Sequence, residues 1–146
     1  MTALGLALSA VLAAIAALHL AWAARVWWPV REEAALARTI AGFRGIDRMP
    51  GPLACMVVAV AVLACLVLAA DLSFAPGLTR LPSWIAATAS GIAGTVFLGR
   101  GIAGFTPFWA RLTPEEPFRT LDRRYYSPLC ILLGLGFVTL IWSNWT

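Results

Sequence analysis

The sequence predicts an all-α membrane protein, a bundle of four transmembrane helices with both termini outside and a short amphipathic helix in the first cytoplasmic loop. Of its 146 residues, 61% are hydrophobic and only 12% are charged, whereas a soluble domain carries about 25% charged residues. The charges fall in three stretches and leave four uncharged windows, residues 1–24, 49–70, 81–99 and 125–146. Because about 20 apolar residues cross the hydrocarbon as a helix, each window predicts one span.

The windows predict one integral membrane domain over residues 1–146, with spans at about 3–28, 51–71, 82–101 and 125–145. The first window has no basic residue at its start, and its first charge is Arg25. A secretory signal has a basic start and a shorter apolar stretch. We therefore expect a retained first helix that runs to about Trp28.

The first loop predicts a short helix of its own. Pro29 can begin it, and Glu32 and Glu33 suit a first turn. Gly42 or Gly45 would end it. One face is apolar, formed by Val30, Ala34, Ala37 and Ala41. A helix with such a face can lie flat on the inner membrane surface.

The second span follows a Pro- and Gly-rich turn at residues 49–52, and the third span carries a stripe of small residues. The stripe repeats every fourth position, at Ala87, Gly91, Thr95 and Gly99. Small residues let helix backbones approach closely in lipid. The stripe predicts a helix–helix face inside the bundle, with a homo-oligomer interface as the alternative.

The third loop contains a capping-box pattern, Thr113 followed by Pro114 and by Glu116, which predicts a short helix that begins there. The fourth span begins near Tyr125. Pro128 is acceptable in its first turn, where a missing N–H costs little.

Arginine placement predicts the orientation. There is no Lys, and ten of the 11 basic residues lie in the first and third loops, namely Arg25, Arg31, Arg38, Arg44, Arg48, Arg100, Arg111, Arg119, Arg123 and Arg124. Basic loops stay on the cytoplasmic side, so both termini should be periplasmic. The all-Arg, Ala-rich composition is typical of a high-GC bacterium and predicts the bacterial cytoplasmic (inner) membrane. Interfacial aromatic residues fit the span ends, namely Trp27, Trp28, Trp84, Tyr125, Tyr126, Trp142 and Trp145.

His19 is the only histidine, and Trp22 lies one turn further on the same face of the first span. Ionisable side chains inside spans are rare and point to function. His19 can bind a metal or haem, relay a proton or donate to a lipophilic headgroup. The alternative is a hydrogen bond to a neighbouring backbone carbonyl or to another helix. His19 and Trp22 are the first two candidate ligand-binding residues.

The remaining candidate ligand-binding residues lie at the arginine-rich side, namely Arg100, Asp122, Arg123 and Tyr126. Arg100 follows the third span and either snorkels to the inner headgroups or pairs with an acid, for which Asp122 is the expected partner. Residues 118–130 place one acid and several arginines before the fourth span. Such an ion cluster either fixes the loops or binds an anionic headgroup or phosphate.

The sequence shows no catalytic constellation. It lacks a nucleophile elbow, a Walker loop, a dinucleotide fingerprint and an HExxH motif, which favours a non-enzymatic role and points to no particular cofactor or metal. Cys55, Cys65 and Cys130 lie in apolar segments without metal-ligand spacing. We expect them to be buried small side chains, with a redox pair as the alternative. Arginines beside apolar segments favour membrane lipids over nucleic acid as partners.

Several short motifs together resemble a bacterial family of small four-helix membrane proteins that is defined only as a domain of unknown function. They are His19-Leu20-Ala21-Trp22, Trp28-Pro29, Met49-Pro50, Arg100-Gly101 and the run from Leu121 to Cys130. The resemblance extends from about His19 to Gly136. It implies four spans and supplies no reaction, substrate or cofactor.

Three functions remain in competition at this point. The favoured one is a non-enzymatic module, either an accessory subunit of a membrane complex or a binder of lipid or of a lipophilic ligand. The alternatives are a small transporter or channel, and a membrane redox protein or enzyme that uses His19. Membrane lipids, other membrane subunits and a second copy of the chain are the expected partners. We expect recognition at the cytoplasmic face or in the inner half of the bundle.

Overall fold

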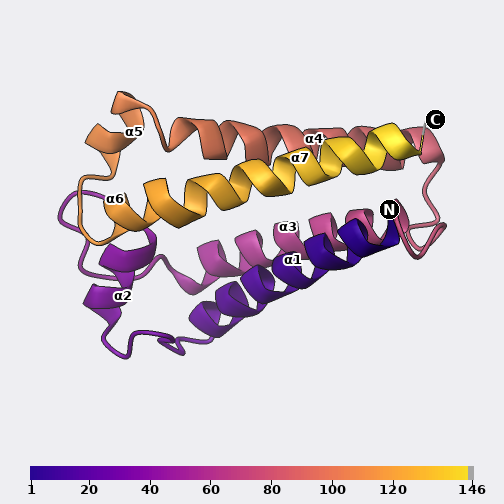
Figure 1. Cartoon of the computed structure of the whole chain (residues 1–146). Coiled ribbons are helices and arrows are strands. Elements are labelled where there is room, and N and C mark those ends of the chain that lie inside the picture. Colours follow the sequence, from indigo (N-terminus) through magenta and orange to yellow (C-terminus); the bar gives the residue numbers. More distant parts are fainter. Residues whose placement is uncertain (145–146) are drawn as a thin grey trace.

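The computed structural model describes residues 1–144, and this part of the chain is helical without strands (Figure 1). The elements are α1 (Thr2–Ala23), α2 (Glu33–Ile40), α3 (Pro52–Asp71), α4 (Ser83–Ala103), α5 (Pro107–Leu112), α6 (Phe118–Leu121), the π-helical turn η1 (Asp122–Tyr126) and α7 (Ser127–Ser143). Four helical stretches are long and apolar enough to cross a membrane, namely α1, α3, α4 and the continuous stretch Phe118–Ser143. The predicted all-α fold with four spans is confirmed. Trp145 and the predicted end of the last span lie outside the described residues.

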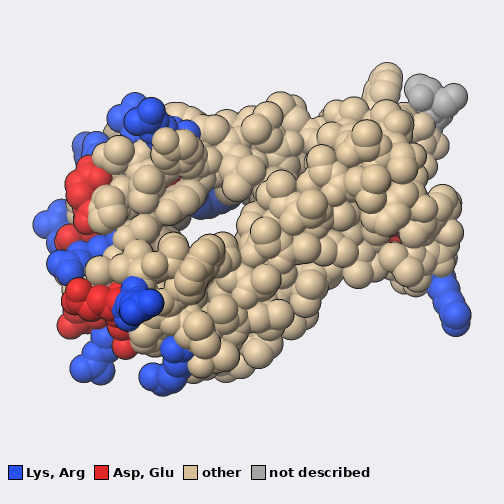
Figure 2. Space-filling view, turned by 60° about the horizontal axis from the view of Figure 1, so that its bottom comes forward, with Lys and Arg blue, Asp and Glu red and all other residues tan. Residues whose placement is uncertain are grey.

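The four long helices form two pairs, because α1 packs mainly on α3 and α4 packs mainly on α7. The N-terminus and the end of α7 lie at one end of the bundle, and α2, α5 and α6 lie at the other (Figure 1). Figure 2 shows that nearly all visible charged side chains gather at this second end, which we call the arginine-rich end. Beside it an opening separates the two halves of the molecule (Figure 2).

A single apolar cluster joins all four long helices. It contains Leu8, Leu12 and Ala16 of α1, Val62 and Ala69 of α3, Ala93 of α4, and Leu133, Phe137 and Leu140 of α7. Other large apolar side chains, such as Leu53 and Leu132, point outward and are exposed. In a membrane these outward side chains face lipid, so their exposure costs nothing.

The predicted short helix of the first loop is present as α2, but it begins at Glu33 and not at Pro29. It ends at Ile40, and Gly42 follows in a left-handed conformation with a φ of 65°. Its apolar side chains Leu36 and Ala37 are fully buried in a second cluster with Trp22, Met49 and Cys55. The apolar face of α2 therefore covers the end of the α1/α3 pair.

A set of contacts that we call the clasp joins the two helix pairs at the arginine-rich end. The backbone N–H of Glu115 donates to the carbonyl of Gly42 at 3.2 Å, and the N–H of Gly45 donates to Glu115 Oε1 at 2.9 Å. Phe118 packs on Gly42 so closely that a Cβ at Gly42 would overlap its ring. The Tyr126 hydroxyl donates to the carbonyl of Thr39 at 3.3 Å.

The first helix is shorter than predicted, because α1 ends at Ala23 and not near Trp28. Arg25 takes a left-handed conformation with a φ of 59°, which stops the helix. The chain then folds back, and the indole Nε1 of Trp22 donates to the carbonyl of Trp28 at 2.9 Å. The prediction from hydropathy was too long because residues 24–28 are apolar apart from Arg25, although the Trp22 side chain holds them in a turn.

The capping-box prediction at Thr113 is wrong. The helix of that loop is α5, which begins at Pro107, and the Thr106 side chain caps it by accepting from the N–H of Trp109 at 3.2 Å. Thr113 follows the end of α5, and its hydroxyl donates to the carbonyl of Trp109 at 2.8 Å. The Thr-Pro pair that starts a helix is thus the one at residues 106–107.

The predicted packing stripe on α4 is wrong at Thr95 and Gly99, which are exposed, whereas Ala87 and Gly91 are half-buried. The buried face of α4 is instead formed by Ala86, Ser90, Ala93, Gly94 and Gly101. A Cβ at Gly134 of α7 would lie 2.8 Å from the carbonyl oxygen of Gly94, so small residues do bring α4 and α7 together. A homo-oligomer interface at the exposed stripe stays a prediction.

Candidate functional site

His19 and Trp22 lie together on α1. Their rings meet edge to face, with centroids 4.9 Å apart. His19 Nδ1 bonds to the carbonyl of Ile15 at 2.8 Å, which requires the proton on Nδ1. Trp22 is buried and donates to Trp28. Both side chains therefore form hydrogen bonds to nearby backbone carbonyls, which is the alternative to a functional role that the sequence left open for His19.

Arg100 and Asp122 form the expected ion pair, with Arg100 Nη2 2.6 Å from Asp122 Oδ1. The Asp122 side chain is only 3% exposed, whereas the Arg100 side chain is 30% exposed. A carboxylate buried to this degree needs several donors to replace its lost water. The structure supplies them from three different elements, α4, α5 and α7.

Two side chains that sequence reasoning missed complete the network around Asp122. The indole Nε1 of Trp109 donates to Asp122 Oδ2 at 3.0 Å, and the hydroxyl of Ser127 donates to Asp122 Oδ1 at 3.1 Å. The guanidinium of Arg100 also lies over the Trp109 ring, 4.6 Å from its centroid. Every oxygen of Asp122 thus has a donor, and the pair is held by α4, α5, η1 and α7.

Glycines at the end of α4 allow this approach. A Cβ at Gly101 would lie 2.8 Å from the carbonyl oxygen of Ser127 and 2.9 Å from the backbone nitrogen of Ile131. A Cβ at Gly104 would overlap the Ser127 side chain and lie 2.9 Å from Asp122 Oδ2. The π-helical turn starts at Asp122, which is a common feature of functional sites.

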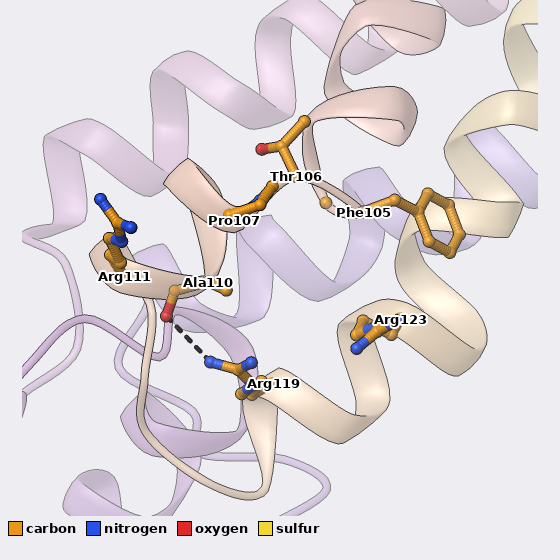
Figure 3. A pocket seen from close by; sticks show the side chains of 8 residues that line it. Phe105, Thr106, Pro107, Ala110, Arg111, Arg119 and Arg123 are labelled. Atoms are coloured by element: carbon orange, nitrogen blue, oxygen red, sulfur yellow. Dashed lines mark hydrogen bonds between the residues drawn. The ribbon is translucent and has the colours of Figure 1, made fainter.

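A pocket of about 340 Å³ lies next to this network, between α5 and the α6–η1 stretch. Its walls are Gly104, Phe105, Thr106, Pro107 and Ala110 on one side, with Arg111, Arg119 and Arg123. Figure 3 shows Arg119 reaching toward Ala110, to whose carbonyl it donates at 3.1 Å, with Arg123 one turn further along the same helical stretch. Arg111 extends away from both of them (Figure 3). We call this the arginine pocket.

The arginine pocket is strongly positive. Between residues 1 and 144, the ion pair of Arg100 with Asp122 is the only one within 4.0 Å, so none of the three pocket arginines is paired with an acid. The nearby acids do not line the pocket: Glu115 accepts from Gly45, and Glu116 accepts from the N–H of Thr120. Three arginines without a paired acid line one hollow, with Arg119 and Arg123 on the same helical stretch, and this favours a phosphate or carboxylate ligand.

The six candidate residues thus fall into separate groups. Arg123 lines the arginine pocket, Arg100 and Asp122 form the network behind it, and Tyr126 belongs to the clasp. His19 and Trp22 lie on α1 in the other helix pair. Their roles in ligand binding stay predictions.

The cysteines are free thiols: Cys55 is buried, and Cys65 and Cys130 are half-buried. Within residues 1–144, no three His, Cys, Asp or Glu side chains come together to hold a metal ion.

No curated protein and no solved structure matches the chain. A family model described as "Protein of unknown function (DUF3995)" matches residues 12–137, and the chain therefore belongs to this family.

Proposed function

We propose that this protein is a non-enzymatic lipid-binding module of the bacterial inner membrane, which holds the phosphate of an anionic lipid headgroup in the arginine pocket. The observation that carries the proposal is that Arg119 and Arg123 line one hollow from the same helical stretch, with Arg111 at its edge, and that none of the three is paired with an acid. A guanidinium binds phosphate oxygens through two parallel N–H groups, which gives both affinity and geometry.

The level of the pocket along the membrane normal supports a lipid as the source of the phosphate. The lining residues 104–107 directly follow the end of α4, and Arg119 and Arg123 directly precede the apolar part of the last span. Both sides of the pocket thus lie where helices leave the hydrocarbon, which is the level of phospholipid headgroups. Lipid phosphates are concentrated at this level of the membrane, whereas a soluble anion is not.

The network behind the pocket supports a fixed arrangement of the arginines. Asp122 is held by Arg100, Trp109 and Ser127, and it immediately precedes Arg123 in η1. Arg119 is held by its bond to Ala110. Because the Arg119 side chain and the backbone before Arg123 are already held, binding costs less conformational entropy than it would with two freely moving arginines.

Arginine placement supports the orientation in this proposal. The pocket lies at the arginine-rich end, which basic loops keep on the cytoplasmic side. The headgroup would then belong to the inner leaflet, whose anionic lipids attract basic side chains by about 1 kcal/mol each. Both termini would be periplasmic.

The test measures retained lipid by native mass spectrometry after release from phosphatidylcholine nanodiscs that contain a minority of phosphatidylglycerol. The variant Arg119→Gln/Arg123→Gln should reduce the phosphatidylglycerol-bound fraction about 30-fold, which corresponds to about 1 kcal/mol for each arginine. Added inorganic phosphate should not displace the lipid. Displacement would instead assign the pocket to a soluble phosphate.

The matched control is Arg38→Gln/Arg44→Gln, which removes the same charge from exposed positions of the first loop that do not line the pocket. This pair should retain phosphatidylglycerol nearly as well as the original protein. Equal losses in the two double variants would mean general surface attraction, and unchanged binding in the pocket variant would mean no site; either result overturns the proposal.

A further inference from the structure

A second pocket lies at the end of the bundle opposite the arginine-rich end. Its volume is about 400 Å³, and residues of the 71–81 loop, the start of α4 and the end of α7 line it. The residues that matter for its chemistry are Asp71, Ser83, Trp84 and Asn144. We call it the Asp71 pocket.

The polar groups of the Asp71 pocket include several hydrogen-bond acceptors. Asp71 Oδ1 accepts from the backbone N–H of Thr79 at 3.0 Å, which leaves Oδ2 without a partner in the described part of the chain. The amide nitrogen of Asn144 donates to the carbonyls of Leu72 and Leu140, both at 2.8 Å. These two bonds fix the orientation of the amide and leave its Oδ1 as an acceptor.

The charge of the Asp71 pocket is opposite to that of the arginine pocket. Asp71 is its only charged lining residue, and Arg80, the one basic residue of the same loop, does not line it. Helices α3 and α7 end at the pocket with their partial negative charges, and only α4 begins there with a partial positive one. The Asp71 carboxylate and these partial charges together favour a cation as the ligand of the pocket.

Trp84 adds an aromatic surface. Trp84 is 70% exposed although it lines the pocket, so its ring is available to a ligand. A cation over an indole ring is attracted by the negative face of the π system. Carboxylate, amide and hydroxyl acceptors beside such a ring suit a group with several N–H donors, which a quaternary ammonium lacks.

From these contacts we propose that the Asp71 pocket binds a primary ammonium group, the one of a phosphatidylethanolamine-type headgroup. The ammonium donates to Asp71 Oδ2 and Asn144 Oδ1 and lies against Trp84. The pocket sits where α3 and α7 end and α4 begins, so it lies at headgroup depth, in the leaflet opposite the arginine pocket. This site is independent of the proposed phosphate site.

The experiment uses the full chain in phosphatidylcholine nanodiscs with a minority of phosphatidylethanolamine, and native mass spectrometry counts the retained lipid. Asp71→Asn keeps an acceptor oxygen for the Thr79 N–H and removes only the charge. It should lower the phosphatidylethanolamine-bound fraction about tenfold. Trp84→Leu changes an exposed side chain and should lower the same fraction by a smaller factor, about threefold.

The control is Arg119→Gln/Arg123→Gln, which should retain phosphatidylethanolamine like the original protein while losing phosphatidylglycerol. Each site thus has its own lipid and its own variant, and the failure of one proposal leaves the other standing. A second measurement adds free ethanolamine to the protein in detergent without lipid. If ethanolamine binds and Asp71→Asn abolishes the binding, the ammonium site stands but its ligand is a soluble amine. Unchanged retention in Asp71→Asn, or equal retention of phosphatidylcholine, would overturn the proposal.

Discussion

In the α1/α3 pair the ionisable side chain inside the span, His19, bonds to the carbonyl of Ile15 one turn earlier in its own helix. In the α4/α7 pair Arg100 reaches 22 residues along the chain to Asp122, and Trp109 and Ser127 complete its surroundings. In the α1/α3 pair the polar side chain forms its hydrogen bond within its own helix, whereas in the α4/α7 pair the hydrogen bonds run between elements. The second solution ties the ends of α4 and α7 together and places Arg123 at a pocket.

This difference predicts which substitutions lower the free energy of unfolding most. A bond within one helix survives movement of that helix against its neighbour, so its loss is local. A bond between helices is lost together with their packing, and its buried members are left without partners. We therefore expect polar substitutions in the α4/α7 pair to cost far more free energy of unfolding than the corresponding change in α1.

The largest effect is expected for Asp122→Ala. It removes the acceptor of Arg100, Trp109 and Ser127, all three of which are at least partly buried. Breaking a buried ion pair costs about 3–5 kcal/mol, and because the Arg100 side chain is 30% exposed we expect the lower end, about 3 kcal/mol. Reversible unfolding in detergent measures this loss.

Asp122→Asn is the companion variant, since its amide oxygen still accepts from Trp109 or Ser127. It should lose about half as much free energy of unfolding as Asp122→Ala. A loss below about 1 kcal/mol in both variants would equal that of an exposed ion pair. The contrast between the two helix pairs would then disappear.

A smaller effect is expected for Gly101→Ala, which tests the close approach of α4 and α7. The added Cβ would meet the backbone of Ser127 and Ile131 at 2.8 and 2.9 Å, and backbone atoms cannot turn aside. Overpacking of this kind costs about 2 kcal/mol. The unfolding measurement in detergent checks it.

Gly99→Ala is the matched control, because a Cβ at Gly99 meets nothing within 4 Å. It sits two residues away on the same helix and should leave the free energy of unfolding unchanged or slightly raised, since Ala favours a helix more than Gly does. If both variants lose stability equally, the loss comes from the helix itself and not from its contact with α7.

The four spans were predictable because hydropathy and helix length are properties of a continuous stretch of chain. The end of α1 was not, because apolar residues resume after Arg25 and continue to Trp28, while the turn depends on the hydrogen bond from Trp22 to the carbonyl of Trp28. The packing face of α4 was missed for a similar reason. Several rows of small residues run along that helix, and only the position of α7 decides which row is buried.

The ion pair of Arg100 and Asp122 was predictable because each lies beside a span, where an unpaired charge is costly. Trp109 gave no comparable signal, since an indole that donates to a buried carboxylate looks in sequence like any loop tryptophan. The Thr106-Pro107 pair is the one local sign that a helix would present it. The arginine pocket itself required the fold, because Arg111 and Arg119 are separated by a loop that runs out to the clasp.

The smallest effect is expected for His19→Ala, which sharpens the comparison from the other side. The variant loses one bond to Ile15 and one edge-to-face contact with Trp22, and its neighbours keep their own partners. The Ile15 carbonyl still accepts from its own helix, so we expect a loss of about 1 kcal/mol. Phosphatidylglycerol retention should stay unchanged, because His19 lies in the other helix pair. A loss as large as that of Asp122→Ala, or a metal or haem absorbance that vanishes with His19, would show that α1 carries chemistry of its own and would revive the redox alternative.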